Sequence, residues 1–504
     1  MSSRTSGEKA AADLAAAFEP WPEEALDAIH EAALAVLERA GIRVDSPHAQ
    51  ELLLAAGCRP LAGGRVAVPR ELVAEALSTC PRSCRLVARD AERSVVLDPE
   101  PGETYVHNMG TVADVADPRT GAHRRATLAD SIRLARVMHR LRNQSVLTSL
   151  VTPEDVPPEL EPLYTYLVLA SETDKLIGGP GISTAAQADA VLDMAQALTG
   201  ADGSGGAYPL DLAFSPVSPL ILGAEVSDAL IAATRRGGVV CEILPCPTAA
   251  TTAPAAVSAA AAQQHAEVLA GVVLVQTVTP GTPVYYGPRL SAVDPRSGGT
   301  ASGTPEVSVI AAVLLARRCG LACDCYGLTS DSKVIDAQFG YERAVNALVG
   351  LLARPRFLSG IGEVQGGAAT CGEALIVDDD ILTNVLHVMA PRPWDAAALD
   401  VEAMVEGTLS SGGFLSTKHT RRYVRSEFPV PTVGYRGGLD DWLHSGRSGV
   451  LEAASERFEA LSADDPLGLP DDIGEALCGV IDQAAARAGV GDRPDPRRIL
   501  SGEI

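Results

Sequence analysis

Strand-like segments recur along most of the chain, and helical patterns fill most of the intervals between them. The intervals are roughly 30 to 55 residues, the length of one strand–helix unit with its loops. The segments begin near Val146, Leu176, Leu210, Val239, Val284, Leu321, Phe357 and Gly413. No Gly-x-Gly-x-x-Gly turn follows the early strands. Eight such units therefore predict an α/β protein with a closed (β/α)₈ TIM barrel rather than an open doubly wound sheet.

The segment before these repeats predicts an N-terminal region of helices and short strands. Residues 23–41 place apolar side chains at helical spacing and end on a glycine, and two shorter helical patterns follow. Between residues 84 and 126, apolar and polar residues alternate around turns, as in a small antiparallel β region. The predicted divisions are a disordered N-terminus (1–20), a helical and β region (21–126), the barrel (127–470) and a C-terminal helix and tail (471–504).

Charge and hydropathy exclude several classes of partner. The formal net charge of −23 repels nucleic-acid phosphates and anionic lipids. No stretch approaches the ~18 to 20 apolar residues of a membrane span, and the first residues carry acidic groups where a secretory signal has an apolar core. The ten cysteines, mostly in apolar segments, are best explained as free buried thiols. We expect a cytoplasmic protein that binds neither nucleic acid nor membranes.

Polar residues gather where the predicted strands end. Residues 323–333 (CDCYGLTSDSK) change from a buried strand to a run of hydroxyl, carboxylate and amine groups. In a TIM barrel, the loops after the carboxyl ends of the strands build the active-site face. Similar changes occur at 213–220, 241–254, 284–294, 359–380 and 412–425. The sequence thus predicts a polar site above the barrel.

A set of longer motifs resembles one known family. They are EALDAIHEAALAVLERAGIRVD, GGRVAVPRELVAEAL, VADVADPRTGAHRRATLAD, SPVSPL, TSDSKVIDAQFGYE and GGFLSTKHTRRYVR, in this order between about residues 21 and 465. Together they resemble the trimethylamine methyltransferase family. The resemblance implies a TIM-barrel enzyme that moves a methyl group from a methylated amine to the cobalt of a corrinoid on a separate protein. It also implies a homo-oligomer.

One departure from the family bears on the substrate. Members that act on trimethylamine itself carry pyrrolysine, whereas every residue here is a standard one. This favours the subgroup that resembles quaternary-amine demethylases. Chemistry points the same way, because a quaternary ammonium leaves as a neutral amine when Co(I) attacks its methyl group. A water-poor site that orients the methyl group is then sufficient, and no side-chain nucleophile is needed.

Candidate site residues follow from this chemistry. Aromatic faces and carboxylates bind methylated cations, and only 4 % of the residues are aromatic. The predicted substrate-binding residues are Tyr285, Tyr286, Asp324, Tyr326 and Arg289, the last for a substrate carboxylate. The predicted catalytic residues are Glu242, Asp331, Glu363 and His419. Simpler interpretations stay open: tyrosines that only pack, Asp331 as a helix N-cap, and His419 as a tie that holds its loop.

The remaining predictions concern metals, cofactors and other activities. Glu242 with nearby cysteines offers zinc ligands, but their spacing lacks Cys-x₂-Cys and neighbouring strand residues point to opposite faces. We predict no metal. No Asp-x-His-x-x-Gly segment is present, so a partner protein is expected to carry the corrinoid. The alternatives are corrinoid-independent or folate-linked methyl transfer, and a non-catalytic cation-binding barrel.

Overall fold

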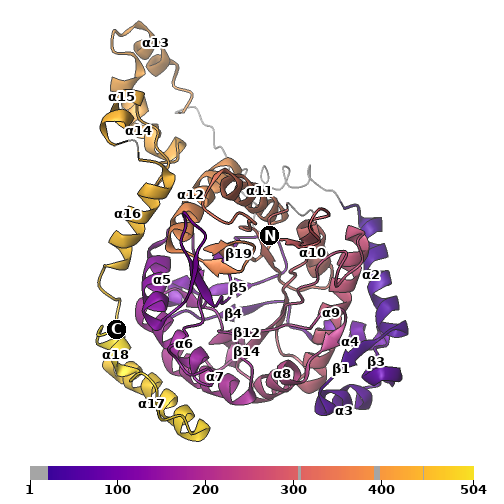
Figure 1. The fold of residues 1–504 in the computed structure, drawn as a ribbon. Helices are drawn as coiled ribbons and strands as arrows, with labels where there is room; N and C mark the ends of the chain where they lie inside the picture. The colour runs from indigo at the N-terminus through magenta and orange to yellow at the C-terminus, as the bar shows by residue number, and fades with distance from the viewer. Residues whose placement is uncertain (1–20, 305–307, 391–397, 447) are drawn as a thin grey trace.

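The computed structural model describes residues 21–304, 308–390, 398–446 and 448–504, so the predicted disordered segment 1–20 lies outside the described residues. Eight parallel strands form its centre (Figure 1). They are β6 (Tyr105–Asn108), β9 (Val146–Leu147), β10 (Leu176–Ile177), β12 (Leu210–Phe214), β14 (Val239–Ile243), β15 (Val284–Tyr286), β18 (Asp324–Tyr326) and β19 (Phe357–Ile361).

The pairing of these strands follows a ring. Parallel ladders join β6 to β9, β9 to β10, β12 to β14, β14 to β15 and β18 to β19. A bridge between Tyr286 and Cys323 joins β15 to the start of β18, and β19 pairs with β6. Between β10 and β12, the amide of Gly179 donates to the Asp211 carboxylate at 3.1 Å. The predicted (β/α)₈ barrel is therefore confirmed.

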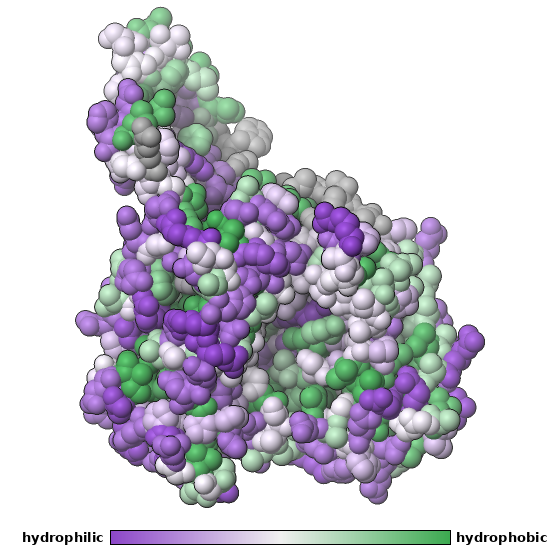
Figure 2. All heavy atoms as spheres, viewed as in Figure 1, coloured by the Kyte–Doolittle hydropathy of each residue, from purple (hydrophilic) through white to green (hydrophobic). Residues whose placement is uncertain are grey.

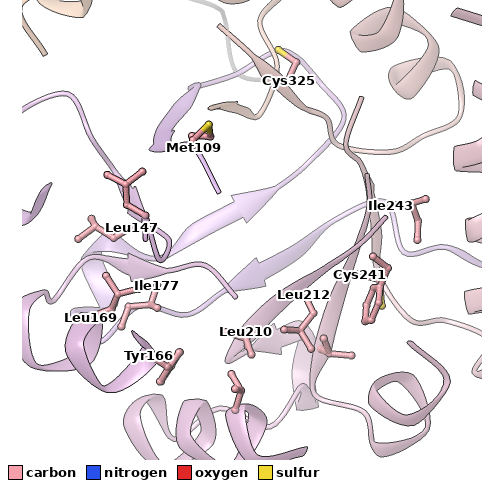
Figure 3. Packing of buried hydrophobic residues seen from close by; sticks show 14 of the residues in the cluster. Met109, Leu147, Tyr166, Leu169, Ile177, Leu210, Leu212, Cys241, Ile243 and Cys325 are labelled. Carbon is pink, nitrogen blue, oxygen red and sulfur yellow. The ribbon is translucent and has the colours of Figure 1, made fainter. Parts of the chain in front are cut away.

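One helix follows each barrel strand and covers the outside of the ring (Figure 1). These helices are α5 (Leu128–Arg140), α6 (Glu161–Glu172), α7 (Ala185–Thr199), α8 (Ala224–Arg236), α9 (Val257–Val278), α10 (Ser308–Arg318), α11 (Ala337–Ala353) and α12 (Gly372–Met389). Apolar side chains that leave the outer face of the strands, such as Leu212, Cys241 and Ile243, pack against them (Figure 3). The main hydrophobic core thus lies between the strands and the helices.

The structure corrects two strand predictions. The first barrel strand is β6, which we expected to belong to the antiparallel region, and the expected strand near Gly413 is wrong. Residues Gly413–Ser416 form a 3₁₀ turn that leads into α14 (Lys418–Glu427). Local hydrogen bonding sets the Gly413 segment, where the Thr417 amide donates to the Phe414 carbonyl oxygen at 3.0 Å, whereas long-range pairing sets β6. A four-residue strand is defined by the strands beside it, and β6 has β9 and β19 as neighbours.

The N-terminal region packs on one side of the barrel. Its helices α2 (Glu23–Arg39), α3 (Pro47–Ala55) and α4 (Arg70–Thr79) lie against α9 (Figure 1). Strands β1 (Ile42–Val44), β2 (Arg59–Pro60) and β3 (Arg65–Ala67) form a small sheet with β13 (Ile221–Leu222).

Short antiparallel strands lie at both ends of the barrel. The pair β4 (Cys84–Leu86) and β5 (Val95–Leu97) packs under the lower barrel residues Val240 and Phe357 and closes that end. A second pair, β7 (Asp114–Ala116) and β8 (His123–Arg125), lies in the loop between β6 and α5. An antiparallel region is therefore present, and it surrounds the first barrel strand.

Beyond α12 the chain forms an extension that projects from the barrel (Figure 1). It contains α13 (Val401–Leu409), α14 and α15 (Leu439–His444). It exposes large apolar side chains such as Leu409 and Leu415, and Figure 2 shows hydrophobic atoms on its surface. The chain then returns through α16 (Val450–Ser462) against α5 and α12, α17 (Asp471–Ala488) against α7, and α18 (Arg497–Leu500) against α6. Among the described residues, no helix is long and apolar enough to cross a membrane.

Candidate active site

A cavity of about 380 Å³ opens inside the barrel at the carboxyl ends of the strands. The face shown in Figure 2 is hollowed near the centre of the ring. Polar and aromatic side chains from seven of the eight strands or their following loops line the cavity. Among them are His107, Asp211, Glu242, Tyr285, Arg289 and Tyr326.

Strand alternation explains which side chains face inward. On β12, Asp211 and Ala213 line the cavity, whereas Leu210 and Leu212 belong to the outer core (Figure 3). On β14, Glu242 lines the cavity between two outward residues. Because successive side chains of a strand point to opposite faces, each strand contributes its polar residue to the lumen at alternate positions.

Three carboxylates form one network with a tyrosine at the bottom of the cavity. The Tyr285 hydroxyl donates to Asp211 Oδ2 at 2.5 Å and lies 3.2 Å from Glu242 Oε2. Arg289 places one guanidinium nitrogen 3.4 Å from Glu242 Oε1 and 2.5 Å from Asp324 Oδ2. One permanent cation therefore contacts two of the three acids, and Tyr285 links the third, Asp211, to Glu242.

The surroundings raise the pKa of two of these acids and lower the pKa of the third. Burial, with help from the nearby Asp324 and Asp211 carboxylates, raises the pKa of Glu242 well above its ordinary value. Burial also raises the pKa of Asp211. Burial acts in the same direction on Asp324, but the charge of Arg289 and the contact with His107 outweigh it and lower the pKa of Asp324 below its usual range. The Asp324–Arg289 pair is thus ionised, whereas the ionised form of Glu242 is disfavoured and a further cation would stabilise it.

Aromatic rings surround this network. The Arg289 guanidinium lies 4.5 Å from the centre of the Tyr326 ring. Phe357 lines the cavity and meets the rings of Tyr285 and His107 edge-on, with centroids 5.8 Å apart in both pairs. His107 Nε2 lies 3.1 Å from Asp324 Oδ2. The cavity therefore combines negative charge with aromatic surface, the two features that bind a methylated cation.

A second cavity of about 370 Å³ adjoins the first on the side of the loops. Arg289 and Tyr326 line both cavities, and Glu363 lines the second one. Burial raises the pKa of Glu363 to about 8. Glu363 is therefore a buried acid next to the main cavity rather than inside it.

The structure brings five of the nine predicted residues into one network or onto its edge. Glu242, Tyr285, Arg289 and Tyr326 line the main cavity, and the Asp324 carboxylate lies directly behind Arg289. This is a placement, and the roles of these residues stay predictions.

Three other predicted residues lie elsewhere. Tyr286 points away from the cavity, because it follows Tyr285 directly on β15, and its hydroxyl lies 3.0 Å from His265 Nδ1 of α9. Asp331 accepts hydrogen bonds from the amides of residues 302 and 303 and anchors that loop. It is not the cap of the next helix, since Asp336 is. His419 lies on α14 in the extension, with Nε2 2.9 Å from the Ala398 carbonyl oxygen.

Sequence reasoning missed three residues of the network, Asp211, His107 and Phe357. Asp211 carried the same signal as Glu242, an isolated acid in an apolar strand (LDLAF). His107 lies on β6, whose position in the barrel was not recognised. The cysteine near Glu242 on β14, Cys241, faces the outer core, so it cannot share a metal ion with Glu242.

Comparisons with known proteins agree with this geometry. The family described as trimethylamine methyltransferase (MTTB) matches residues 3–489. Glycine betaine methyltransferase of Desulfitobacterium hafniense (strain Y51) is 29 % identical over 472 residues, which cover 93 % of this chain and 97 % of that protein.

Two further relatives have amine methyltransferase names. Trimethylamine methyltransferase MttB of Desulfitobacterium hafniense (strain DSM 10664 / DCB-2) is 25 % identical, over 93 % of this chain and 95 % of that protein. A solved structure, monomethylamine methyltransferase of Methanosarcina barkeri, is 11 % identical with a TM-score of 0.48, over 90 % of this chain and 92 % of that one. The family match over nearly the whole chain shows that the protein belongs to the trimethylamine methyltransferase family and is a methyltransferase.

Proposed function

We propose that this enzyme transfers a methyl group from a quaternary methylated amine to the Co(I) of a corrinoid carried by a separate protein. The observation that carries the proposal is a network of three carboxylates, which Tyr285 and Arg289 link in a cavity walled by aromatic rings. A permanent cation is the ligand that such a site favours. The relative named for glycine betaine, which is a quaternary amine, supports the same substrate class.

The charge balance of the cavity supports a cationic substrate. Arg289 pairs closely with Asp324 and only at 3.4 Å with Glu242, so its single charge leaves Glu242 and Asp211 incompletely neutralised. Keeping both ionised in a buried site is costly, which is why burial raises the pKa of each. A quaternary ammonium in the cavity supplies the missing positive charge. Aromatic contacts with its methyl groups contribute roughly 0.5 to 2 kcal/mol each when the cation is desolvated.

The reaction requires positioning more than side-chain chemistry. The carbon–nitrogen bond of one methyl group breaks, and its electron pair stays on nitrogen, so the product is a neutral tertiary amine. A corrinoid on its carrier protein would supply the nucleophile. The residues of this chain bind the ammonium group, aim one methyl group toward the loops and exclude water. Orientation of this kind provides about 7 to 11 kcal/mol of the barrier in favourable cases.

The second cavity supports an approach from the loop side. It shares Arg289 and Tyr326 with the substrate cavity and is otherwise formed by loops that follow the strands. A co-substrate that enters there would face the substrate without passing through the barrel wall. We place the carrier protein over this end.

The test is a methyl-transfer assay with the purified enzyme. Co(I) cobalamin is mixed with glycine betaine, carnitine, choline or trimethylamine, and methyl–cobalt absorbance is followed. We expect transfer from a quaternary amine and none from trimethylamine. The variant Glu242→Gln should lose most of the activity, whereas Glu161→Gln, which changes a buried carboxyl on α6, should keep it.

Two other outcomes would replace the proposal. Turnover of a methylated substrate without any corrinoid would show a corrinoid-independent or folate-linked enzyme. Binding of quaternary amines with no methyl transfer, also with added carrier protein, would show a cation-binding barrel.

A further inference from the structure

Two histidines and a cysteine meet outside the barrel, on the far side of β15 from the substrate cavity. They are His30 of α2, His265 of α9 and Cys319, which directly follows α10. Each offers one ligand atom, and the three atoms lie within 4.8 Å of one another. His30 Nδ1 and His265 Nε2 are 2.9 Å apart. Nothing in the proposed methyl transfer uses these residues.

The orientation of His265 is fixed by a second contact. Its Nδ1 lies 3.0 Å from the Tyr286 hydroxyl, and the two rings stack with centroids 5.7 Å apart. Histidines that bind metals commonly use their other ring nitrogen in such a hydrogen bond, which sets the tautomer and the direction of the ring. Tyr286 therefore presents the Nε2 atom of His265 toward His30 and Cys319.

The three helices that carry these residues are held together beside the cluster. Leu26 and Ile29 of α2 pack with Ala261 of α9 and Leu315 of α10. Arg318 of α10 also forms ion pairs with acidic residues of α2. The backbone positions of the cluster are thus set by packing, as a preorganised site requires.

Two of the three residues in the cluster are partly exposed. His265 is fully buried, whereas His30 and Cys319 are half-buried. The 2.9 Å between the two nitrogens is slightly short for a tetrahedral zinc site, where Zn–N bonds of ~2.0 to 2.1 Å separate two nitrogens by about 3.3 Å. A small rotation of the half-buried His30 side chain supplies the difference.

We propose that His30, His265 and Cys319 bind a divalent transition-metal ion, preferably Zn²⁺, with a water molecule as the fourth ligand. Two imidazoles and a thiolate suit zinc, whereas calcium and magnesium prefer oxygen. The Cys319 thiol gives its proton to water when the metal binds. The metal fastens the N-terminal helix α2 to the barrel helices α9 and α10, so its role is structural and separate from the substrate cavity.

Metal titration of the full-length protein tests this proposal. The protein is treated with a chelator, dialysed and titrated with Zn²⁺ by calorimetry and with Co²⁺ by absorbance. We expect one Zn²⁺ per chain, a higher melting temperature with Zn²⁺, and a thiolate-to-cobalt absorbance band. Cys319→Ser should abolish that band, and His30→Ala should weaken Zn²⁺ binding at least tenfold.

Matched controls keep the result decisive. Cys246→Ser and His48→Ala change an exposed cysteine and an exposed histidine outside the cluster, and both should bind the metal as the unchanged protein does. If His30→Ala does not fold, Cys319→Ser alone decides, because the cobalt band reports its thiolate directly. The absence of stoichiometric binding would show that the two histidines form only a hydrogen-bonded contact. A cobalt band that persists in Cys319→Ser would show that a different thiolate binds the metal, and either result would overturn the proposal.

Discussion

Binding of a quaternary ammonium should become tighter as the pH rises, because the cation needs Glu242 ionised. Burial and the neighbouring acids raise the pKa of this carboxyl well above its ordinary value, so the free protein keeps this proton to a higher pH than an exposed glutamate would. Choline has no group that titrates in this range. Any pH dependence of its affinity therefore comes from groups of the protein. Each bound cation should release up to one proton from Glu242.

The expected size follows from the charge pair. A cation about 4 Å from a carboxylate gains about 4 kcal/mol at an effective dielectric constant of ~20, and nothing comparable when the acid is neutral. Below the pKa of Glu242, each pH unit therefore changes the dissociation constant about tenfold, or ~1.4 kcal/mol. Above that pKa the affinity should level off.

Calorimetry of choline binding between pH 6 and 9, in buffers of different ionisation enthalpy, measures both the affinity and the released protons. Glu242→Gln should bind weakly at every pH and show no slope. Glu161→Gln removes a carboxyl on α6 whose pKa burial raises to about 7, and it should keep the slope of the unchanged protein. A flat profile in the unchanged protein, or an undiminished slope in Glu242→Gln, would refute the role given to Glu242.

Three further predictions concern stability. Arg289→Gln leaves Asp324 buried without its cation, so urea denaturation should show a loss of about 3 to 5 kcal/mol; a loss below about 1 kcal/mol would contradict this ion pair's importance. Gly179→Ala puts a methyl group into a backbone carbonyl of β12 and should lower the melting temperature, whereas Gly181→Ala, with more room, should not. Burial raises the pKa of Glu363 to about 8, so the folded state holds a proton that the unfolded state loses near pH 4.5, and this group reduces stability as the pH rises between these values. Glu363→Gln should therefore gain a few kcal/mol relative to the unchanged protein between pH 5 and 8 in the same urea assay, and an equal difference at both pH values would exclude the raised pKa.

Strand alternation made part of the site predictable from the sequence. An acid inside VVCEI has to face the lumen or a partner, and Glu242 faces the lumen. The same argument applied to LDLAF would have found Asp211. Alternation also requires that Tyr285 and Tyr286 point in opposite directions, but it does not say which of them faces inward. That choice depends on the register of β15 against β14, where Glu242 lies opposite Tyr285.

Long-range pairing made the rest unpredictable. The strand β6 has only four residues, and its place in the barrel depends on β9 and β19, the latter some 250 residues further along the chain. His107 was missed for this reason. Asp331 was expected near the substrate, but the amides that it binds lie on a loop before α10, and no local pattern reveals such a contact.

Asp211 has two tasks that experiments will find hard to separate. Its carboxylate takes a hydrogen bond from the Gly179 amide, where β10 meets β12, and another from the Tyr285 hydroxyl in the lumen. The contact between β10 and β12 therefore depends on a carboxylate that also lines the substrate cavity. A cation bound in the cavity favours the ionised form of Asp211, which accepts both hydrogen bonds more strongly. Binding of the cation should then slow the deuterium exchange of the Gly179 amide, so that exchange at the junction of β10 and β12 reports whether the cavity is occupied.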